Sequence, residues 1–104
     1  MQKIFIIGNV GRVPTMRSNA KGVNFYEFSV GVNGRNDNCT WYSVLLSGQS
    51  KIAEYLTKGR QVFVEGTFSV DVYKGEPALT LFADNVQLLG TKNDTPQDNT
   101  PDTY

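Results

Sequence analysis

Trp41 and Tyr73 are the two side chains whose type and surroundings most favour a chemical role. Trp41 begins a strand-like alternation whose apolar positions are Tyr42 and every second residue after it, so the indole is predicted to point outward. Tyr73 ends a similar alternation and precedes Lys74. An outward ring can stack on a nucleic-acid base, while a neighbouring lysine contacts phosphate. The alternatives are that Trp41 covers the core or a subunit interface, and that Tyr73 forms an ordinary cross-strand pair.

Basic side chains are concentrated in the first part of the chain. Residues 1–60 hold eight basic and three acidic residues, whereas residues 61–104 hold two and seven. An anionic partner is therefore expected on surfaces built by the first part, although any single cation could simply be solvated. Arg12 and Arg17 bracket a predicted loop containing Pro14, and Arg35 falls in a predicted turn at 34–38. The candidate phosphate contacts are Lys3, Arg12, Arg17, Arg35, Lys51 and Lys74.

Several classes of function are excluded by residues that the chain lacks. It has no histidine, which is the commonest general base and metal ligand, and its single cysteine, Cys39, cannot form an internal disulfide. No phosphate-binding glycine loop, dinucleotide fingerprint or zinc motif occurs. We therefore expect no catalytic residue, no metal and no cofactor. The longest apolar run, Ile4 to Ile7, is too short for a membrane span, so we expect a cytoplasmic protein without a membrane partner.

The elements that position these side chains are predicted to be mostly strands. Period-two alternation and β-branched residues indicate strands at 3–9, 26–33, 40–47, 62–73 and 78–88, with a bend or bulge at Gly66 and a hairpin turn at 74–77. One short helix is predicted at 50–58, with Ser50 at its start and Gly59 after its end. This order predicts an all-β protein: a five-stranded OB-fold Greek-key barrel with one short helix between strands 3 and 4.

The last fourteen residues differ in composition from the rest. They contain three aspartates and two prolines, and Tyr104 is their only large apolar side chain. Such a segment cannot bury enough surface to offset its ordering entropy. We therefore expect a folded domain at 1–90 and a flexible polar, acidic tail at 91–104.

Several motifs together resemble the bacterial single-stranded DNA-binding proteins of replication. The most specific is the twelve-residue stretch from Tyr55 to Gly66, which contains Lys-Gly-x-x-Val-x-Val-Glu-Gly; further matches are 3–11, 28–33 and 41–44. The resemblance implies a non-enzymatic OB-fold, nucleoid-associated in a bacterial cytoplasm, that coats single strands in replication, recombination or repair. It also implies a homotetramer, with a dimer as the smaller alternative. Trp41 and Tyr73 match the stacking aromatics of this family, and Lys3 and Arg17 match positions that are commonly basic.

The chain departs from the family pattern at several positions. Ser47 stands where the family often has an aromatic residue, Ser69 and Asp71 stand where it is often basic, and the turn 34–39 has no aromatic. The end of the tail has no long acidic run, which leaves recruitment of replication proteins open. These departures keep two alternatives: a primosome-type accessory protein that acts mainly through protein contacts, and an interaction module that binds no nucleic acid.

Overall fold

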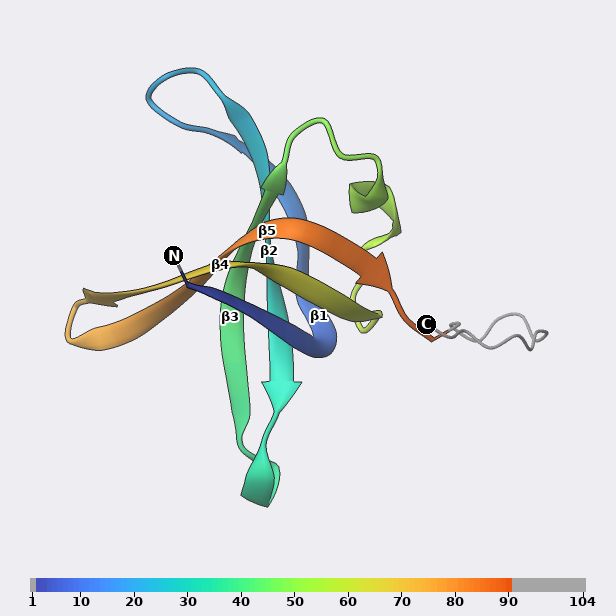
Figure 1. Ribbon diagram of the computed structural model, residues 1–104, viewed down its shortest axis with the longest axis vertical. Helices are drawn as coiled ribbons and strands as arrows, with labels where there is room; N and C mark the ends of the chain where they lie inside the picture. The colour runs from blue at the N-terminus through green and yellow to red at the C-terminus, as the bar shows by residue number, and fades with distance from the viewer. Residues whose placement is uncertain (1, 91–104) are drawn as a thin grey trace.

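Five strands form a closed barrel in the computed structural model, which describes residues 2–90 (Figure 1). The expected tail, 91–104, lies outside the described residues. The strands are β1 (Lys3–Ser18), β2 (Asn24–Asn33), β3 (Cys39–Ser47), β4 (Gln61–Tyr73) and β5 (Glu76–Leu88), and their order around the barrel is β1-β2-β3-β5-β4. Two short 3-10 turns, η1 (Arg35–Asp37) and η2 (Ile52–Tyr55), interrupt the connections. The all-β, five-stranded architecture expected from the sequence is confirmed.

The core follows from the alternation that the strands carry. The inward-facing positions of β2, β3 and β4 are largely valine, leucine and phenylalanine, and Phe28, Val30, Val44, Val62 and Val64 are fully buried. Leu56, just after η2, is 1% exposed and belongs to the same core cluster. Because period two sends every second side chain outward, the same strands present a second set of residues to solvent. That outer set contains the candidate binding residues.

One seam closes the barrel. All neighbouring strands pair antiparallel except β3 and β5, which pair in parallel through Ser43 with Thr80, Val44 with Leu81 and Leu45 with Phe82. The predicted irregularity at Gly66 is present as a register shift between β4 and β5. A Cβ at Gly66 would lie 2.0 Å from the Phe82 carbonyl oxygen, so glycine is needed for the two backbones to approach there.

Two local predictions were wrong. The helix expected at 50–58 is only the 3-10 turn η2, because the chain leaves the turn at Leu56 to bury that side chain. The Ser50 hydroxyl oxygen does accept a hydrogen bond from the Ile52 N–H, at 3.4 Å, and Gly59 has the expected positive φ of 89°. The loop expected around Pro14 is also absent, since β1 continues to Ser18 and accommodates the proline at a register shift between Arg12 and Thr15.

Three hairpins extend beyond the barrel (Figure 1). The β1–β2 hairpin turns at 19–23, the β2–β3 hairpin turns through η1, and the β4–β5 hairpin turns at Lys74 and Gly75. Both residues of this last turn have positive φ, 54° for Lys74 and 80° for Gly75, as a tight two-residue hairpin turn requires. Among the described residues no helix is long and apolar enough to cross a membrane.

Candidate nucleic-acid interface

Trp41 lies on the outer face of β3, as predicted, and is 55% exposed. Its ring covers two glycines of neighbouring strands. A Cβ at Gly11 would lie 2.3 Å from Cζ3 of the indole, and a Cβ at Gly31 would lie 2.9 Å from the same atom. Gly31 is the cross-strand partner of Trp41. One part of the indole therefore packs on bare backbone while the rest remains open to solvent, which is the geometry of a stacking platform.

Two arginines lie on β1, whose strand pairs with β2 beside Trp41. The backbone N–H of Arg12 donates to Ser29 Oγ at 2.8 Å, which fixes the strand next to Gly11. Arg17 pairs with Phe25, and its Nε donates to Glu27 at 2.5 Å. That ion pair engages Nε, and a guanidinium carries two further NH₂ groups that can also donate hydrogen bonds.

Lys3 lies in a less favourable environment for a phosphate contact. Its Nζ donates to Asp84 at 2.7 Å. The hydrogen bond to Asp84, and then the charge of that carboxylate, raise the pKa of Lys3 above its ordinary value. Lys3 is thus a stable cation whose charge is already balanced locally, and a phosphate would have to compete with Asp84 for it.

Tyr73 and Lys74 sit at the tip of the β4–β5 hairpin. Tyr73 is 67% exposed, and Lys74 Nζ lies 5.4 Å from the centre of its ring, within cation–π distance. Asp71 lies two residues earlier on the same face of β4. This carboxylate repels phosphate, so the hairpin offers an aromatic surface and one cation together with one opposing charge.

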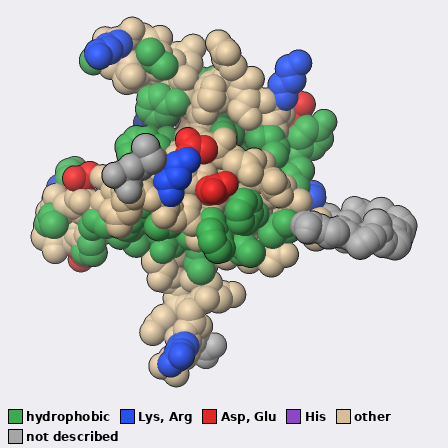
Figure 2. Space-filling model, viewed as in Figure 1, with side chains coloured by type: hydrophobic (Ala, Val, Ile, Leu, Met, Phe, Trp, Pro, Cys, Tyr) green, Lys and Arg blue, Asp and Glu red, His purple; other side chains and the backbone are tan. Residues whose placement is uncertain are grey.

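The remaining two candidates lie at opposite ends of the β2–β3 hairpin. Arg35 is in η1, beyond the Trp41 end of β3, and Lys51 precedes η2, beyond the Ser47 end. Both are exposed. Figure 2 shows basic side chains at the tips of the β1–β2 and β2–β3 hairpins, and both basic and acidic side chains on the surface between them. The structure therefore brings Trp41, Arg12 and Arg17 onto one face but spreads Arg35, Lys51, Tyr73 and Lys74 around its margins.

A hollow on the same outer face was not predicted from the sequence. It lies where β2, β3 and β5 meet, and we call it the Phe25–Phe82 hollow; its lining residues are Asn19, Phe25, Leu45, Leu46, Ser47 and Phe82. Phe82 is 46% exposed although its strand neighbour Leu81 is fully buried. The alternation in 78–88 could have located this outward ring, since Leu81 and Ala83 on either side of it face the core.

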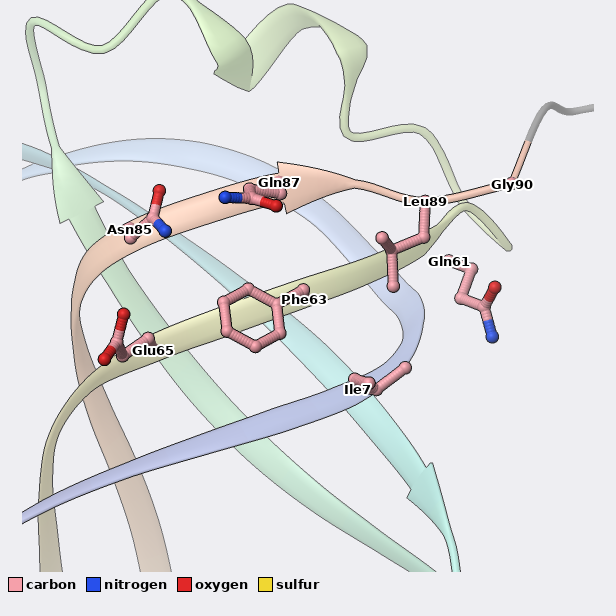
Figure 3. A pocket seen from close by; sticks show the side chains of 8 residues that line it. All are labelled: Ile7, Gln61, Phe63, Glu65, Asn85, Gln87, Leu89 and Gly90. Atoms are coloured by element: carbon pink, nitrogen blue, oxygen red, sulfur yellow. The ribbon is translucent and has the colours of Figure 1, made fainter. Parts of the chain in front are cut away.

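A second, separate groove lies on the outside of β1, β4 and β5. Figure 3 shows Phe63 at its centre, with Ile7 from β1 and Leu89 beyond β5 on either side and Glu65, Asn85 and Gln87 along its rim. The Phe63 ring also contacts Phe5, with ring centres 5.7 Å apart. Phe5 and Ile7 are largely exposed. We call this surface the Phe5–Phe63 face.

The same part of β1 has an unpaired edge. Residues 3–8 pair with β4, whereas pairing with β2 begins at Asn9. Within the described residues, no group of three or more His, Cys, Asp or Glu side chains could hold a metal ion. The chemistry that residues 2–90 offer is stacking, apolar contact and charge.

Comparison with known sequences gives one family. The pattern of the single-strand binding protein family matches residues 1–89. A single-stranded DNA-binding protein from Rickettsia conorii is 26% identical, over 89% of this chain and 75% of the relative. One from Xanthomonas axonopodis pv. citri is 29% identical over 90% of this chain, which spans only 61% of that relative.

Solved structures share the fold. The mitochondrial single-stranded DNA-binding protein of S. cerevisiae superposes with a TM-score of 0.71 at 24% identity, covering 85% of this chain and 93% of the other. A small single-stranded DNA-binding protein from Streptomyces coelicolor gives 0.71 at 22% identity, with 84% and 91% covered. The dimeric N-terminal domain of PriB from Thermoanaerobacter tencongensis gives 0.67 at 19% identity, with 86% and 97% covered.

Proposed function

The chain belongs to the single-strand binding protein family, and from that premise we propose that it binds and protects single-stranded DNA with little regard to base sequence. Curated relatives are named single-stranded DNA-binding proteins. The proposal covers replication, recombination and repair, in which single strands are exposed. It requires binding and no catalysis, and it places the protein with the DNA in a bacterial cytoplasm.

Trp41 is the observation that carries the proposal. A half-exposed indole packed on two glycine backbones is held in position before any ligand arrives, so little ordering entropy is lost when a base stacks on it. Every base has an aromatic face, which explains why such a contact tolerates any sequence. Arg12 and Arg17 lie on the neighbouring strand, where their charges suit the phosphates of the stacked strand.

The other basic candidates complete the path in this proposal. Lys74 and Tyr73 meet the strand on the β4–β5 hairpin, while Arg35 and Lys51 contact it at the two ends of the β2–β3 hairpin. Lys3 contributes least, because Asp84 already balances its charge. Phosphate contacts of this kind add affinity without reading sequence.

We also propose that the protein acts as a homotetramer. The unpaired edge of β1 at 3–8 can extend a sheet into a second copy, and a pair of copies can bury the Phe5–Phe63 face against another pair. Exposed Phe5 and Ile7 next to Phe63 form an apolar surface that association would remove from water. A dimer, the smaller alternative, would form through the unpaired edge of β1 alone and would not bury the Phe5–Phe63 face.

One observation favours a second function. The chain has the fold of the PriB domain, and it has Ser47, Ser69 and Asp71 where the resemblance leads one to expect aromatic or basic side chains. An accessory protein of the primosome type, with weak DNA binding and stronger protein contacts, would fit those replacements. It would leave the stacking role of Trp41 small.

Titration with oligo-dT distinguishes the two functions. Trp41 is the sole tryptophan, so a stacked base should quench the fluorescence of the protein strongly. The Trp41→Ala variant, measured by anisotropy of a labelled oligonucleotide, should bind more weakly by about 1 to 3 kcal/mol.

Two results would contradict the proposal. Unchanged affinity in a folded Trp41→Ala variant would remove stacking from its main position and favour the accessory function. Failure of the wild-type protein to bind oligo-dT at all would exclude both the coating function and the path described above. The matched control is Tyr55→Ala, since Tyr55 is equally exposed, at 56%, but lies on η2.

A further inference from the structure

We propose that the Phe25–Phe82 hollow binds one nucleobase of the same strand that stacks on Trp41. The inference rests on the proposed function and adds a second base-binding position, supplied mainly by a residue of β5. Trp41 and Leu45 point to the same side of β3, four residues or about 13 Å apart. A single strand running along β3 would pass from one to the other.

The walls of the hollow suit a flat, apolar group. Phe82 is the register partner of Leu45 across the closing seam, and Phe25 is the register partner of Ser47 on the other side of β3. The two rings therefore flank β3 from β5 and β2, with Leu45 between them. Ser47 is small, so it leaves open the space that an aromatic side chain at that position would occupy. A base can enter there and contact the phenylalanine rings.

The rim of the hollow offers hydrogen-bond donors. Asn19 Oδ1 accepts from the N–H of Lys21 at 2.8 Å and of Val23 at 3.1 Å, which leaves the amide nitrogen as the group that Asn19 can still use. Ser47 Oγ accepts from the Gln49 N–H at 3.2 Å and keeps its hydroxyl proton to donate. Every base presents an acceptor to such donors, a carbonyl oxygen in thymine, cytosine and guanine and a ring nitrogen in adenine.

Charge around the hollow indicates a nucleotide rather than an apolar segment of a protein. Arg17, Phe25 and Ser47 lie in one row across β1, β2 and β3. Glu27 accepts from Arg17 Nε, and the two terminal NH₂ groups of a guanidinium can donate to a phosphate beside it. Lys21 follows Asn19 in the same hairpin turn and has no carboxylate partner among residues 2–90. Cations beside an apolar hollow match a base with its phosphate.

The first test compares Phe82→Ala, Phe82→Leu and wild type by anisotropy with labelled oligo-dT. Removal of the ring in Phe82→Ala should weaken binding by about fivefold or more, the loss typical of one base contact. Phe82→Leu preserves apolar volume at the seam and should lie between the two, which guards against a folding defect. Quenching of Trp41 at saturation should stay the same, because its own stacking is untouched. Tyr55→Ala serves again as the control and should bind as the wild type does.

The second test compares oligo-dT with oligo-dA in the same proteins. Adenine strands stack on themselves before binding, but this property of the free strand is identical for wild type and variant. Any change in the dT to dA affinity ratio therefore reports the protein. The ratio should stay near the wild-type value in Phe82→Ala while both affinities fall, because every base offers an aromatic face to Phe82 and an acceptor to the rim.

Three outcomes would overturn the inference, each in a recognisable way. If Trp41→Ala weakens binding while Phe82→Ala matches the wild type, the hollow holds no base although the proposed function stands. A dT to dA ratio that changes about tenfold or more in Phe82→Ala would contradict a hollow that accepts any base. A changed molecular mass of Phe82→Ala in light scattering would assign the hollow to contacts between copies instead. If the wild type binds no oligonucleotide, the proposed function itself fails.

Discussion

The Trp41 indole can lie where it does because the two residues beneath it, Gly11 and Gly31, have no side chain. Gly11→Ala would put a Cβ 2.3 Å from the ring, so the indole would have to move away from its position over the two glycines. We expect weaker binding of oligo-dT and less quenching at saturation, although the ring itself is retained. Gly34→Ala is the control, because the nearest atom to its Cβ would be 3.6 Å away. Normal binding by a folded Gly11→Ala variant would mean that packing of the indole on the glycines is unimportant for binding of oligo-dT.

Lys3 and Asp84 give a prediction about competition for charge. Asp84→Asn should release Lys3 for phosphate, tighten binding of oligo-dT and steepen the dependence of log affinity on log salt by about 0.7, the value for one additional contact on a single strand. Glu54→Gln changes the net charge equally without releasing a lysine, and it should leave the slope unchanged. Equal slopes for all three proteins would exclude Lys3 from the DNA path.

This competition should be insensitive to pH near neutrality. The pKa of Lys3 is raised in the folded protein, so its pair with Asp84 contributes fully below the pKa of an unfolded lysine, about 10.4. The contribution is lost only as the pH rises above that value and through the folded-state pKa. A salt slope that changed between pH 7 and pH 9 would therefore come from other groups.

The β4–β5 hairpin carries a carboxylate, Asp71, close to the lysine and tyrosine that are proposed to contact DNA. Asp71→Arg should tighten binding and steepen the salt dependence, because it replaces a repulsive contact with a phosphate contact beside Tyr73. Asp71→Asn separates the two effects, since it removes the repulsion without adding a cation. Both variants should act alike on oligo-dT and on mixed sequences. An unaltered slope in Asp71→Arg would place this hairpin outside the DNA path.

Strands were predicted more successfully than the parts that join them. The alternation of apolar and polar residues in 26–33 and 62–73 reflects burial of one face of each strand, and this pattern can be read directly from the sequence. The length of β1 was missed because Pro14 looks like a break, whereas register shifts in a bent strand accommodate it. The helix at 50–58 was overpredicted, since the need to bury Leu56 outweighs local helix propensity over so few residues.

The candidate site shows the same division. Alternation placed Trp41 outward correctly. The packing of its ring on Gly11 and Gly31 depends on cross-strand register, which cannot be read from one sequence. Partners of cations were equally hidden, because Asp84 is distant from Lys3 in the chain. Phe82 was overlooked because its importance comes from a seam between β3 and β5, strands that are far apart in sequence.

At the scale of the whole molecule, assembly can be separated from DNA binding. Ile7→Asp puts a charge on the Phe5–Phe63 face but leaves the barrel core intact, so light scattering should report a smaller particle than the wild-type multimer. Val13→Asp is matched in exposure, at 48% for both residues, and lies outside that face. It should keep the wild-type mass. A monomeric wild type, or an Ile7→Asp variant of full mass, would contradict the proposed assembly.

The closing seam also has a consequence for how the protein is made. Ser43–Leu45 can pair with Thr80–Phe82 only after β5 has been synthesised, because β5 is the last strand of the chain's described part. Pairing over so long a separation is slow compared with hairpin formation. In a nascent chain on the ribosome, Trp41 and the two glycines that it covers, on β1, β2 and β3, would be synthesised before the barrel can close. Closure of the barrel, and with it the wall that Phe82 provides, therefore follows the synthesis of β5.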